Sequence, residues 1–190
     1  MCIRDRYYFG AIDDDYATPG DLWRSDGTPT GTVKVAAMSA AGQGVITIVS
    51  SAGGLVHFAF IDSAGTGMEP WRSDGTALGT IFLKDINPGT GGSNVGGWVG
   101  SGRHAYFRAQ TPPDTQLWRS DGTPDGTVLA TGASGDPVVG NIGRIVQTAG
   151  KVFFNGSEAS VGAELFVLID QLFVDGFESG DLTAWSAHRP

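Results

Sequence analysis

Three aspartates recur at one position of the sequence and are the first residues to consider for chemistry. Asp26, Asp74 and Asp121 each stand in the phrase Arg-Ser-Asp-Gly-Thr, and a Gly-Thr pair follows at a fixed distance. Calcium takes about six to eight oxygen ligands, commonly from several carboxylates of one loop. Each phrase offers one carboxylate, apart from Asp125 beside the third. We therefore expect these aspartates to cap turns, and a calcium-stabilised structural repeat is kept as an alternative.

The histidines and a denser carboxylate group offer weaker candidates. Asp13, Asp14 and Asp15 are consecutive, but they have no equivalent elsewhere in the chain, and we interpret them as part of a solvated loop. The three histidines do not share a repeat position, so no Ser-His-Asp arrangement can be placed, and we expect them to be structural. They are His57, His104 and His188.

Two further short motifs could in principle carry a catalytic, phosphate-binding or glycosylation site. The segment 91–95, Gly-Gly-Ser-Asn-Val, fails the nucleophile-elbow pattern and lacks the lysine of a phosphate-binding loop, which indicates a flexible connection. Asn155-Gly156-Ser157 is formally a glycosylation sequon, to which we assign no role. The sequence thus predicts no catalytic residue, no cofactor-binding residue, no metal ligand and no cofactor.

The recurring phrase belongs to a repeat of about 48 residues. Its tryptophans, Trp23, Trp71 and Trp118, lie 48 and 47 residues apart, and one further step of 48 reaches Phe166 in a degenerate fourth copy without Asp-Gly-Thr. Each unit divides into β-branched and aromatic pieces separated by Gly, Asp, Asn or Pro, the pattern of strands. The pieces are an aromatic run (7–9, 56–58, 105–107, 152–154), the Trp segment, a segment after Gly-Thr (32–35, 80–83, 127–129) and an apolar segment (45–49, 95–99, 142–146).

The spacing separates constant from variable parts of the repeat. The span from the Trp to the second Gly-Thr has one length in three copies, while the stretch between the aromatic run and the Trp varies. Asp-Gly in a short connection predicts a tight hairpin, in which the paired threonines form hydrogen bonds. Adjacent Trp and Arg on a strand point to opposite faces, so we expect the Trp between sheets and the Arg on the other face or at the rim, paired with an Asp.

Four short strands in each period predict an all-β fold, a partial β-propeller of about three and a half four-stranded antiparallel blades in an open arc or incomplete ring. A solenoid of two-stranded units is the alternative architecture. The predicted organisation sets apart residues 1–6, assigns 7–170 to the repeats and 171–190 to a C-terminal tail. The units are 7–54, 55–101, 102–149 and 150–170.

These units resemble the ELWxxDGT repeat of bacterial secreted proteins over residues 7–169. The continuation 81–89, Ile-Phe-Leu-Lys-Asp-Ile-Asn-Pro-Gly, matches that family closely, whereas Asp21 and Gln116 replace its Glu and Pro70 replaces its Leu. The resemblance implies secretion and a propeller-like fold, and it assigns no catalytic residues.

The two ends of the chain resemble sequences other than the repeat. Residues 1–6, Met-Cys-Ile-Arg-Asp-Arg, resemble the translation of a sequencing adapter in a metagenomic reading frame, and they contain Cys2, the single cysteine. Residues 172–186 resemble a short C-terminal signature of the Asp-Gly-Phe-Glu-Ser-Gly type from exported proteins, and we expect either an export tag or a closing strand. The interpretation is a fragment without its signal peptide, from a protein that is secreted or held at the cell surface.

Composition narrows the functional classes. The formal net charge of −8 comes from 12 basic and 20 acidic residues, without a Lys/Arg cluster, which argues against nucleic acid as a partner. The sequence holds no apolar run long enough to span a membrane. We expect a non-catalytic scaffold or binding module that presents its variable loops to an unknown glycan or protein ligand at the cell surface. The alternative is a fragment of a propeller enzyme, a glycan lyase or hydrolase, whose catalytic residues lie in missing blades.

Overall fold

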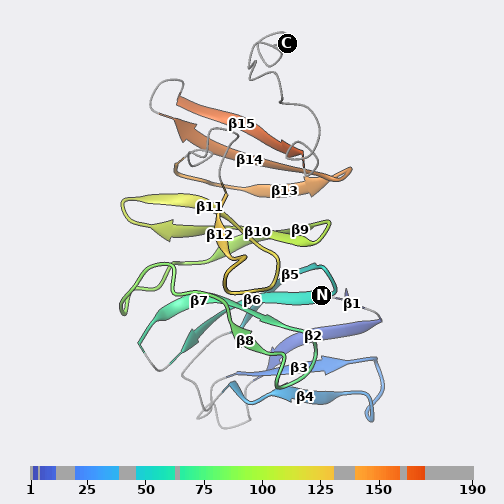
Figure 1. The fold of residues 1–190 in the computed structure, drawn as a ribbon. Coiled ribbons are helices and arrows are strands. Elements are labelled where there is room, and N and C mark those ends of the chain that lie inside the picture. Colours follow the sequence, from blue (N-terminus) through green and yellow to red (C-terminus); the bar gives the residue numbers. More distant parts are fainter. Residues whose placement is uncertain are drawn as a thin grey trace.

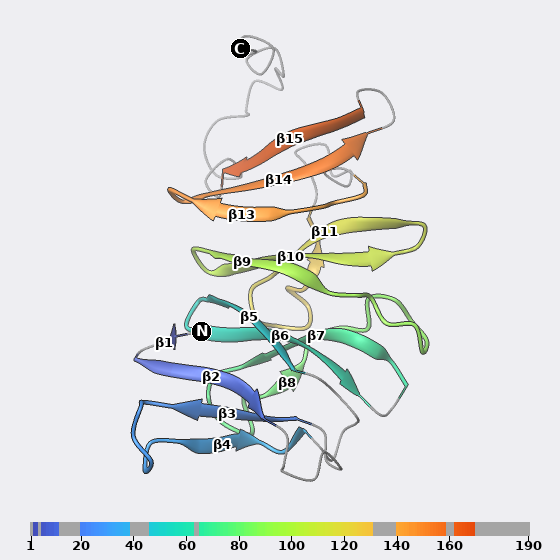
Figure 2. The ribbon, with the colours of Figure 1, turned by 180° about the vertical axis from the view of Figure 1, so that it is seen from behind.

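The computed structural model describes residues 2–3, 5–11, 20–38, 46–62, 65–130, 140–158 and 162–169. This described part is all-β, as predicted: it contains no α-helix, and its strands form four antiparallel sheets. The sheets lie on one another in chain order, from the N-terminal sheet (blue) to the C-terminal sheet (orange), in both views (Figure 1; Figure 2). The Asp13–Asp15 group, His188 and the predicted tail lie outside the described residues.

Each sheet follows the chain from strand to neighbouring strand. The first sheet holds β1 (Cys2–Ile3), β2 (Arg6–Ala11), β3 (Asp21–Ser25) and β4 (Val33–Ala36). The second holds β5 (Thr47–Ala52), β6 (Leu55–Asp62), β7 (Gly67–Ser73) and β8 (Ile81–Phe82). The third holds β9 (Gly96–Ser101), β10 (His104–Thr111), β11 (Asp114–Ser120) and β12 (Val128–Leu129). The fourth holds β13 (Ile145–Thr148), β14 (Lys151–Glu158) and β15 (Gly162–Ile169).

The sheets are one strand out of phase with the sequence units. The apolar fourth piece of a unit pairs with the aromatic run of the next unit, as β5 does with β6. The physical reason is the two-residue turn between them, in which Gly53 (φ 59°) and Gly54 (φ 79°) adopt the left-handed conformation of a tight hairpin. The same arrangement joins β9 to β10 and β13 to β14. The second, third and fourth sheets therefore each begin one strand before the corresponding sequence unit, whose predicted first residue is 55, 102 or 150.

Residues 1–6, which the sequence sets apart from the repeat, contribute to the first sheet. Cys2 and Ile3 form β1 and pair with Tyr7 and Arg6 of β2. β1 therefore takes the place in the first sheet that β5, β9 and β13 take in the others.

A search of the described residues for an apolar helix of membrane-spanning length finds none.

Apolar layers fill the three spaces between successive sheets. We call the face of a sheet that looks toward the preceding sheet its leading face, and the opposite face its trailing face. Because side chains alternate along a strand, each strand supplies both faces. The first layer contains Tyr8, Leu22 and Val35 against Val56, Phe58 and Phe60. The second contains Ala52, Ala59 and Ile86 with Trp98, Phe107 and Trp118. The third contains Tyr106, Leu117 and Ala130 with Ile145, Val152 and Phe154.

The repeated Trp lies on the leading face, as the alternation predicts. Trp71 packs against the first layer and Trp118 lies within the second, where 8% of its surface is exposed. Phe166, at the equivalent position of the fourth sheet, packs against the third layer and stacks on Phe154 with ring centroids 5.5 Å apart. The expected place of the Trp between neighbouring sheets is therefore confirmed for these copies.

Candidate functional site

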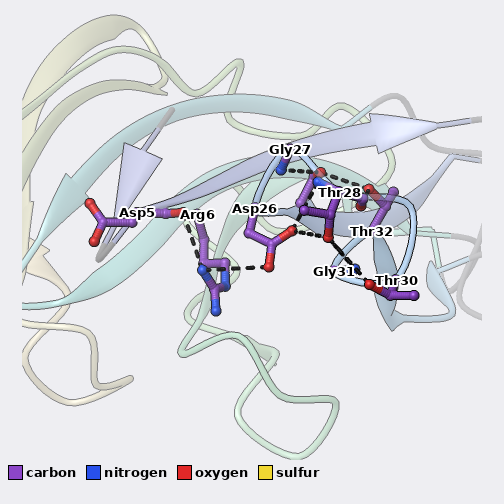
Figure 3. A network of polar contacts seen from close by, with 9 residues as sticks. Asp5, Arg6, Asp26, Gly27, Thr28, Thr30, Gly31 and Thr32 are labelled. Atoms are coloured by element: carbon purple, nitrogen blue, oxygen red, sulfur yellow. Dashed lines mark hydrogen bonds and ion pairs between the residues drawn. The ribbon is translucent and has the colours of Figure 1, made fainter.

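The repeated phrase folds into a cage of side-chain hydrogen bonds at the turns β3–β4, β7–β8 and β11–β12. In the third copy, Oδ1 of Asp121 accepts hydrogen bonds from the backbone N–H (2.9 Å) and the hydroxyl (2.7 Å) of Thr123. The Thr123 hydroxyl oxygen in turn accepts the N–H of Gly126 at 2.9 Å. The same bonds form around Asp26 and Asp74. Figure 3 shows the first copy, where Arg6 also approaches Asp26 at 3.9 Å.

A serine and a second threonine close the cage. Ser120 Oγ accepts the N–H of Gly122 at 3.0 Å, and the hydroxyl of Thr127 donates to the Thr123 carbonyl at 2.7 Å. Because that bond uses the single hydroxyl hydrogen of Thr127, the 2.8 Å contact between Ser120 and Thr127 must have Ser120 as donor. Each of these hydroxyls therefore has its hydrogen engaged in the turn itself. Turn capping by Asp and hydrogen bonding by the paired threonines are confirmed, while the serine's part was not foreseen.

The cage also sets the ionisation of its carboxylates. The hydroxyl hydrogen bond from Thr28, Thr76 or Thr123 is the main cause that holds the pKa of the capped aspartate below its usual value of 3.8. A carboxylate with a lowered pKa stabilises the fold above pH 3.8, and this contribution is lost as the pH falls below it. Within the described residues, no three His, Cys, Asp or Glu side chains gather closely enough to hold a metal ion.

The second glycine of each phrase leaves room for the capping carboxylate. A Cβ atom on Gly126 would lie 2.0 Å from Oδ1 of Asp121, and the same short approach recurs at Gly79 and Gly31. We expect Gly126→Ala to displace Asp121 and lower the unfolding free energy by about 1–2 kcal/mol through the lost charge-assisted hydrogen bonds.

A double-mutant cycle in urea denaturation tests that cause. In the Asp121→Ala background no carboxylate remains to be displaced, so Gly126→Ala should change the free energy by less than about 0.5 kcal/mol. The backbone of Gly126 does not have a positive φ, so alanine itself introduces no backbone strain there. Equal costs in both backgrounds would show that the glycine is needed for another reason.

The first glycine of the phrase faces the preceding sheet. Gly122 has φ 90°, and a Cβ atom there would lie 2.2 Å from Leu55 Cδ1. Gly75 meets the Tyr8 hydroxyl in the same way, at 2.5 Å. Gly27 has the same φ of 90°, but a Cβ atom there would meet nothing within 4 Å. The turn glycine is therefore part of the sheet–sheet interface wherever the structure describes a preceding sheet.

This difference supplies a matched pair of substitutions. Gly27→Ala introduces only the left-handed backbone strain, about 1–2 kcal/mol. Gly122→Ala adds the collision with Leu55, and overpacking typically adds about 1–3 kcal/mol more. We expect the difference in thermal or urea stability between the two variants to report the interface alone. Identical losses would contradict the contact between the turn and the preceding sheet.

The repeated arginine ties neighbouring sheets through backbone carbonyls. Arg72 Nε donates to the Gly122 carbonyl of the next sheet at 3.0 Å, and its terminal nitrogen donates to the Gly79 carbonyl at 2.8 Å. The trailing-face position agrees with the predicted alternation of Trp and Arg. The expected ion pair with an Asp is replaced here by these carbonyl contacts, which connect residues 50 positions apart in the chain.

A buried carboxylate holds the connection between the second and third sheets. Glu69 is fully buried and accepts hydrogen bonds from the Ser93 hydroxyl (2.6 Å) and from the backbone N–H groups of Ile86 (3.0 Å) and Asn87 (3.4 Å). Burial is the main cause that raises the pKa of Glu69. The hydroxyl of Ser93, in the Gly-rich 91–95 segment, thus donates a hydrogen bond to a buried carboxylate, a contact that the sequence did not predict. The sequence alone did not predict a buried role for Glu69, which stands at the repeat position that Asp21 and Gln116 fill in the other copies.

His57 occupies a structural position. It is fully buried on the trailing face of β6, where its ring lies 5.9 Å from that of Trp98. Neither ring nitrogen has a hydrogen-bond partner among the described residues. Burial, with a smaller contribution from Arg72, lowers the pKa of His57 to about 4. Tyr8 and Tyr106 take the same place in their sheets, which the pairing of each with the repeated Arg defines.

The remaining candidates are structural or surface residues. His104 packs edge-on against Tyr106, with ring centroids 6.2 Å apart. Asn155 of the sequon accepts the backbone N–H of Arg144 at 2.6 Å and so takes part in β-sheet structure. Pro112 and Pro113, between β10 and β11, are exposed in one of the connections whose length varies between copies.

No protein-family model matches the chain, and no curated protein sequence matches it significantly.

Proposed function

We propose that this chain is part of a bacterial, propeller-type repeat scaffold that binds a glycan or protein ligand outside the cell and has no catalytic activity of its own. The arrangement of the sheets supports the propeller. The first strands of successive sheets contact each other, β5 with β9 and β9 with β13. Blades that radiate from a common axis bring their innermost strands together in this way.

One observation carries the proposed role. The turns that hold the cage are the same in three copies, whereas the connections at the other end of the strands differ in length. The cage repeats with nearly the same distances in three copies, and its hydroxyls are engaged within the turn. The connections between the aromatic-run strand and the Trp strand leave from the opposite end of the Trp strand and differ in length. A rigid framework with variable connections is the usual design of a binding module.

A binding screen with matched variants tests this proposal. The purified chain is applied to an array of bacterial and algal glycans and to cell-wall preparations. A double substitution, Pro112→Gly with Pro113→Gly, changes an exposed variable connection, and Leu78→Ser changes an exposed position in a turn at the other end of the strands. We expect binding that the proline variant reduces at least about tenfold and the Leu78 variant retains, a difference of roughly 1.4 kcal/mol. Equal loss in both variants, or hydrolysis or lysis of a glycan, would contradict it.

The extracellular location rests on the resemblance of the repeats to secreted proteins. A long sequencing read of the source DNA across the codons before Tyr7 tests it together with the origin of residues 1–6. We expect the reading frame to continue upstream through further repeats to an export signal. A gene that starts at Met1 would contradict both the location and the adapter origin.

A further inference from the structure

The third turn cage contains a second Asp-Gly pair, in which the aspartate is not capped. Each cage has an Asp-Gly pair whose carboxylate accepts the cage hydrogen bonds, at Asp26, Asp74 and Asp121. The third copy adds Asp125–Gly126 four residues later, where the first copy has Thr30-Gly31. Among the described residues, the carboxylate of Asp125 has no hydrogen-bond or ion-pair partner.

An aspartate followed by glycine can rearrange without an enzyme. The backbone nitrogen of the glycine attacks the side-chain carboxyl carbon, and a C–N bond forms. The protonated carboxyl group loses its hydroxyl and the amide loses its hydrogen, which leave together as water, and a five-membered succinimide remains. A water molecule then opens the ring at the main-chain carbonyl carbon, so that the chain continues through the side chain as isoaspartate. Glycine favours the attack because it has no Cβ atom to hinder it.

The cage opposes this rearrangement at Asp121. Its Oδ1 is held by the N–H and the hydroxyl of Thr123, at 2.9 and 2.7 Å. The N–H of Gly122, whose nitrogen would attack, is donated to Ser120 Oγ at 3.0 Å. The hydroxyl bond from Thr123 also keeps the pKa of Asp121 below its usual value, so at neutral pH its carboxyl group seldom carries the proton that the leaving hydroxyl requires.

Asp125 meets a single one of these constraints. The N–H of Gly126 donates to the Thr123 hydroxyl at 2.9 Å, but the carboxylate of Asp125 is not held. Asp121 and Asp125 are both exposed and each is followed by Gly-Thr, so neither access of water nor the following sequence separates them. The reaction at Asp125 breaks one of these hydrogen bonds, whereas the reaction at Asp121 breaks three.

We propose that Asp125–Gly126 is a site of spontaneous isoaspartate formation in the folded protein, and that the cage protects Asp26, Asp74 and Asp121 from the same modification. Isoaspartate adds one methylene group to the main chain just before Gly126. That glycine lies against the carboxylate of Asp121 without room for a Cβ atom, so the modification should open the third cage. This proposal rests on the turn geometry and does not depend on the proposed ligand-binding role.

Ageing of the purified chain tests the site. The chain is kept at neutral pH, once folded and once in urea that unfolds it, and is then digested with trypsin. Asp121 and Asp125 fall in one peptide, residues 120–144, and electron-transfer fragmentation assigns the isoaspartate to one or the other. In urea we expect both to react at similar rates. In the folded chain Asp125 should react at least about tenfold faster, because its carboxylate lacks the two charge-assisted hydrogen bonds.

The first copy supplies a matched pair of substitutions. Asp125→Thr gives the third cage the sequence of the first, Ser-Asp-Gly-Thr-Pro-Thr-Gly-Thr, and should abolish its modification. Thr30→Asp makes the reverse exchange at an exposed position, and should create a site at residue 30 while Asp26 stays unmodified. Circular dichroism confirms that the fresh variants are folded. Ageing should lower the melting temperature of the parent more than that of the Asp125 variant.

Three results would overturn the proposal. The first is modification of Asp121 as fast as Asp125 in the folded chain, because the cage would then give no protection. The second is a folded chain that stays unmodified at Asp125 while the chain in urea is fully converted there. The third is a folded Thr30→Asp variant that forms no isoaspartate at residue 30.

Discussion

Replacing Phe107 with alanine is expected to lower the free energy of unfolding by about 3–5 kcal/mol, whereas the same change at Phe9 should lower it by only about 1 kcal/mol. The two residues occupy one repeat position, each opposite the repeated Trp. Phe107 is fully buried and stacks on Trp98 with ring centroids 4.1 Å apart, so its removal leaves a cavity. Phe9 is partly in contact with solvent in the single chain, so its removal leaves no closed cavity.

Urea denaturation followed by tryptophan fluorescence and by circular dichroism measures both changes. Phe58→Ala and Phe154→Ala serve as controls, since both residues are buried as deeply as Phe107. Equal losses for Phe9 and Phe107 would show that the Phe9 side chain is covered in the folded protein, against its partial exposure in the structure.

Acid is expected to destabilise the protein through His57, by up to about 3 kcal/mol between pH 6.5 and 4. The folded-state pKa of His57 is lowered from 6.5 to about 4 because its ring is buried without a hydrogen-bond partner among the described residues. Between these values the unfolded chain binds the proton and the folded chain does not, so stability falls as the pH falls through this window. Each pKa unit corresponds to about 1.4 kcal/mol, which gives the stated limit.

The variant His57→Tyr isolates this effect, because tyrosine fills the same place in the first and third sheets. We expect its unfolding free energy to lose the part of the pH dependence that His57 causes between pH 6.5 and 4, whatever its absolute stability. Glu69, whose pKa is raised by burial, acts with the opposite sign in both proteins and cancels in the comparison. Parallel pH profiles for parent and variant would show that His57 is protonated or hydrated in the folded state.

The strands and the turns could be predicted because their signals are local. The repeated Trp marked β3, β7 and β11, and Asp-Gly-Thr marked the turns that follow them. Alternation along a strand was enough to place Trp71 and Arg72 on opposite faces. The degenerate copy was also found, since Phe166 lies opposite Phe154 as Trp118 lies opposite Phe107.

The grouping of strands into sheets could not be predicted in the same way. The segment that became β5 lies between two aromatic-run strands, and both were suitable partners by composition. The tight turn at Gly53-Gly54 decides the pairing. The burial of Glu69 and His57 was equally hidden, because it depends on residues of the next sheet and its connection, such as Ser93 and Trp98.

The turn cage has a consequence for how fast such a protein can fold. Its side-chain bonds join residues at most seven positions apart, so each hairpin can form on the timescale of hairpins, about 1–10 μs. Among the residues that the structure describes, the longest side-chain hydrogen bond between sheets spans 50 positions, a separation set by the repeat period and not by the number of copies. The sequence separation between contacting sheets therefore stays about one repeat as units are added, and the loop-closure entropy of each new contact between sheets does not grow with the number of copies. Gene duplication can therefore lengthen this stack of sheets, and each new sheet still packs against a sheet that lies about one repeat away in the sequence.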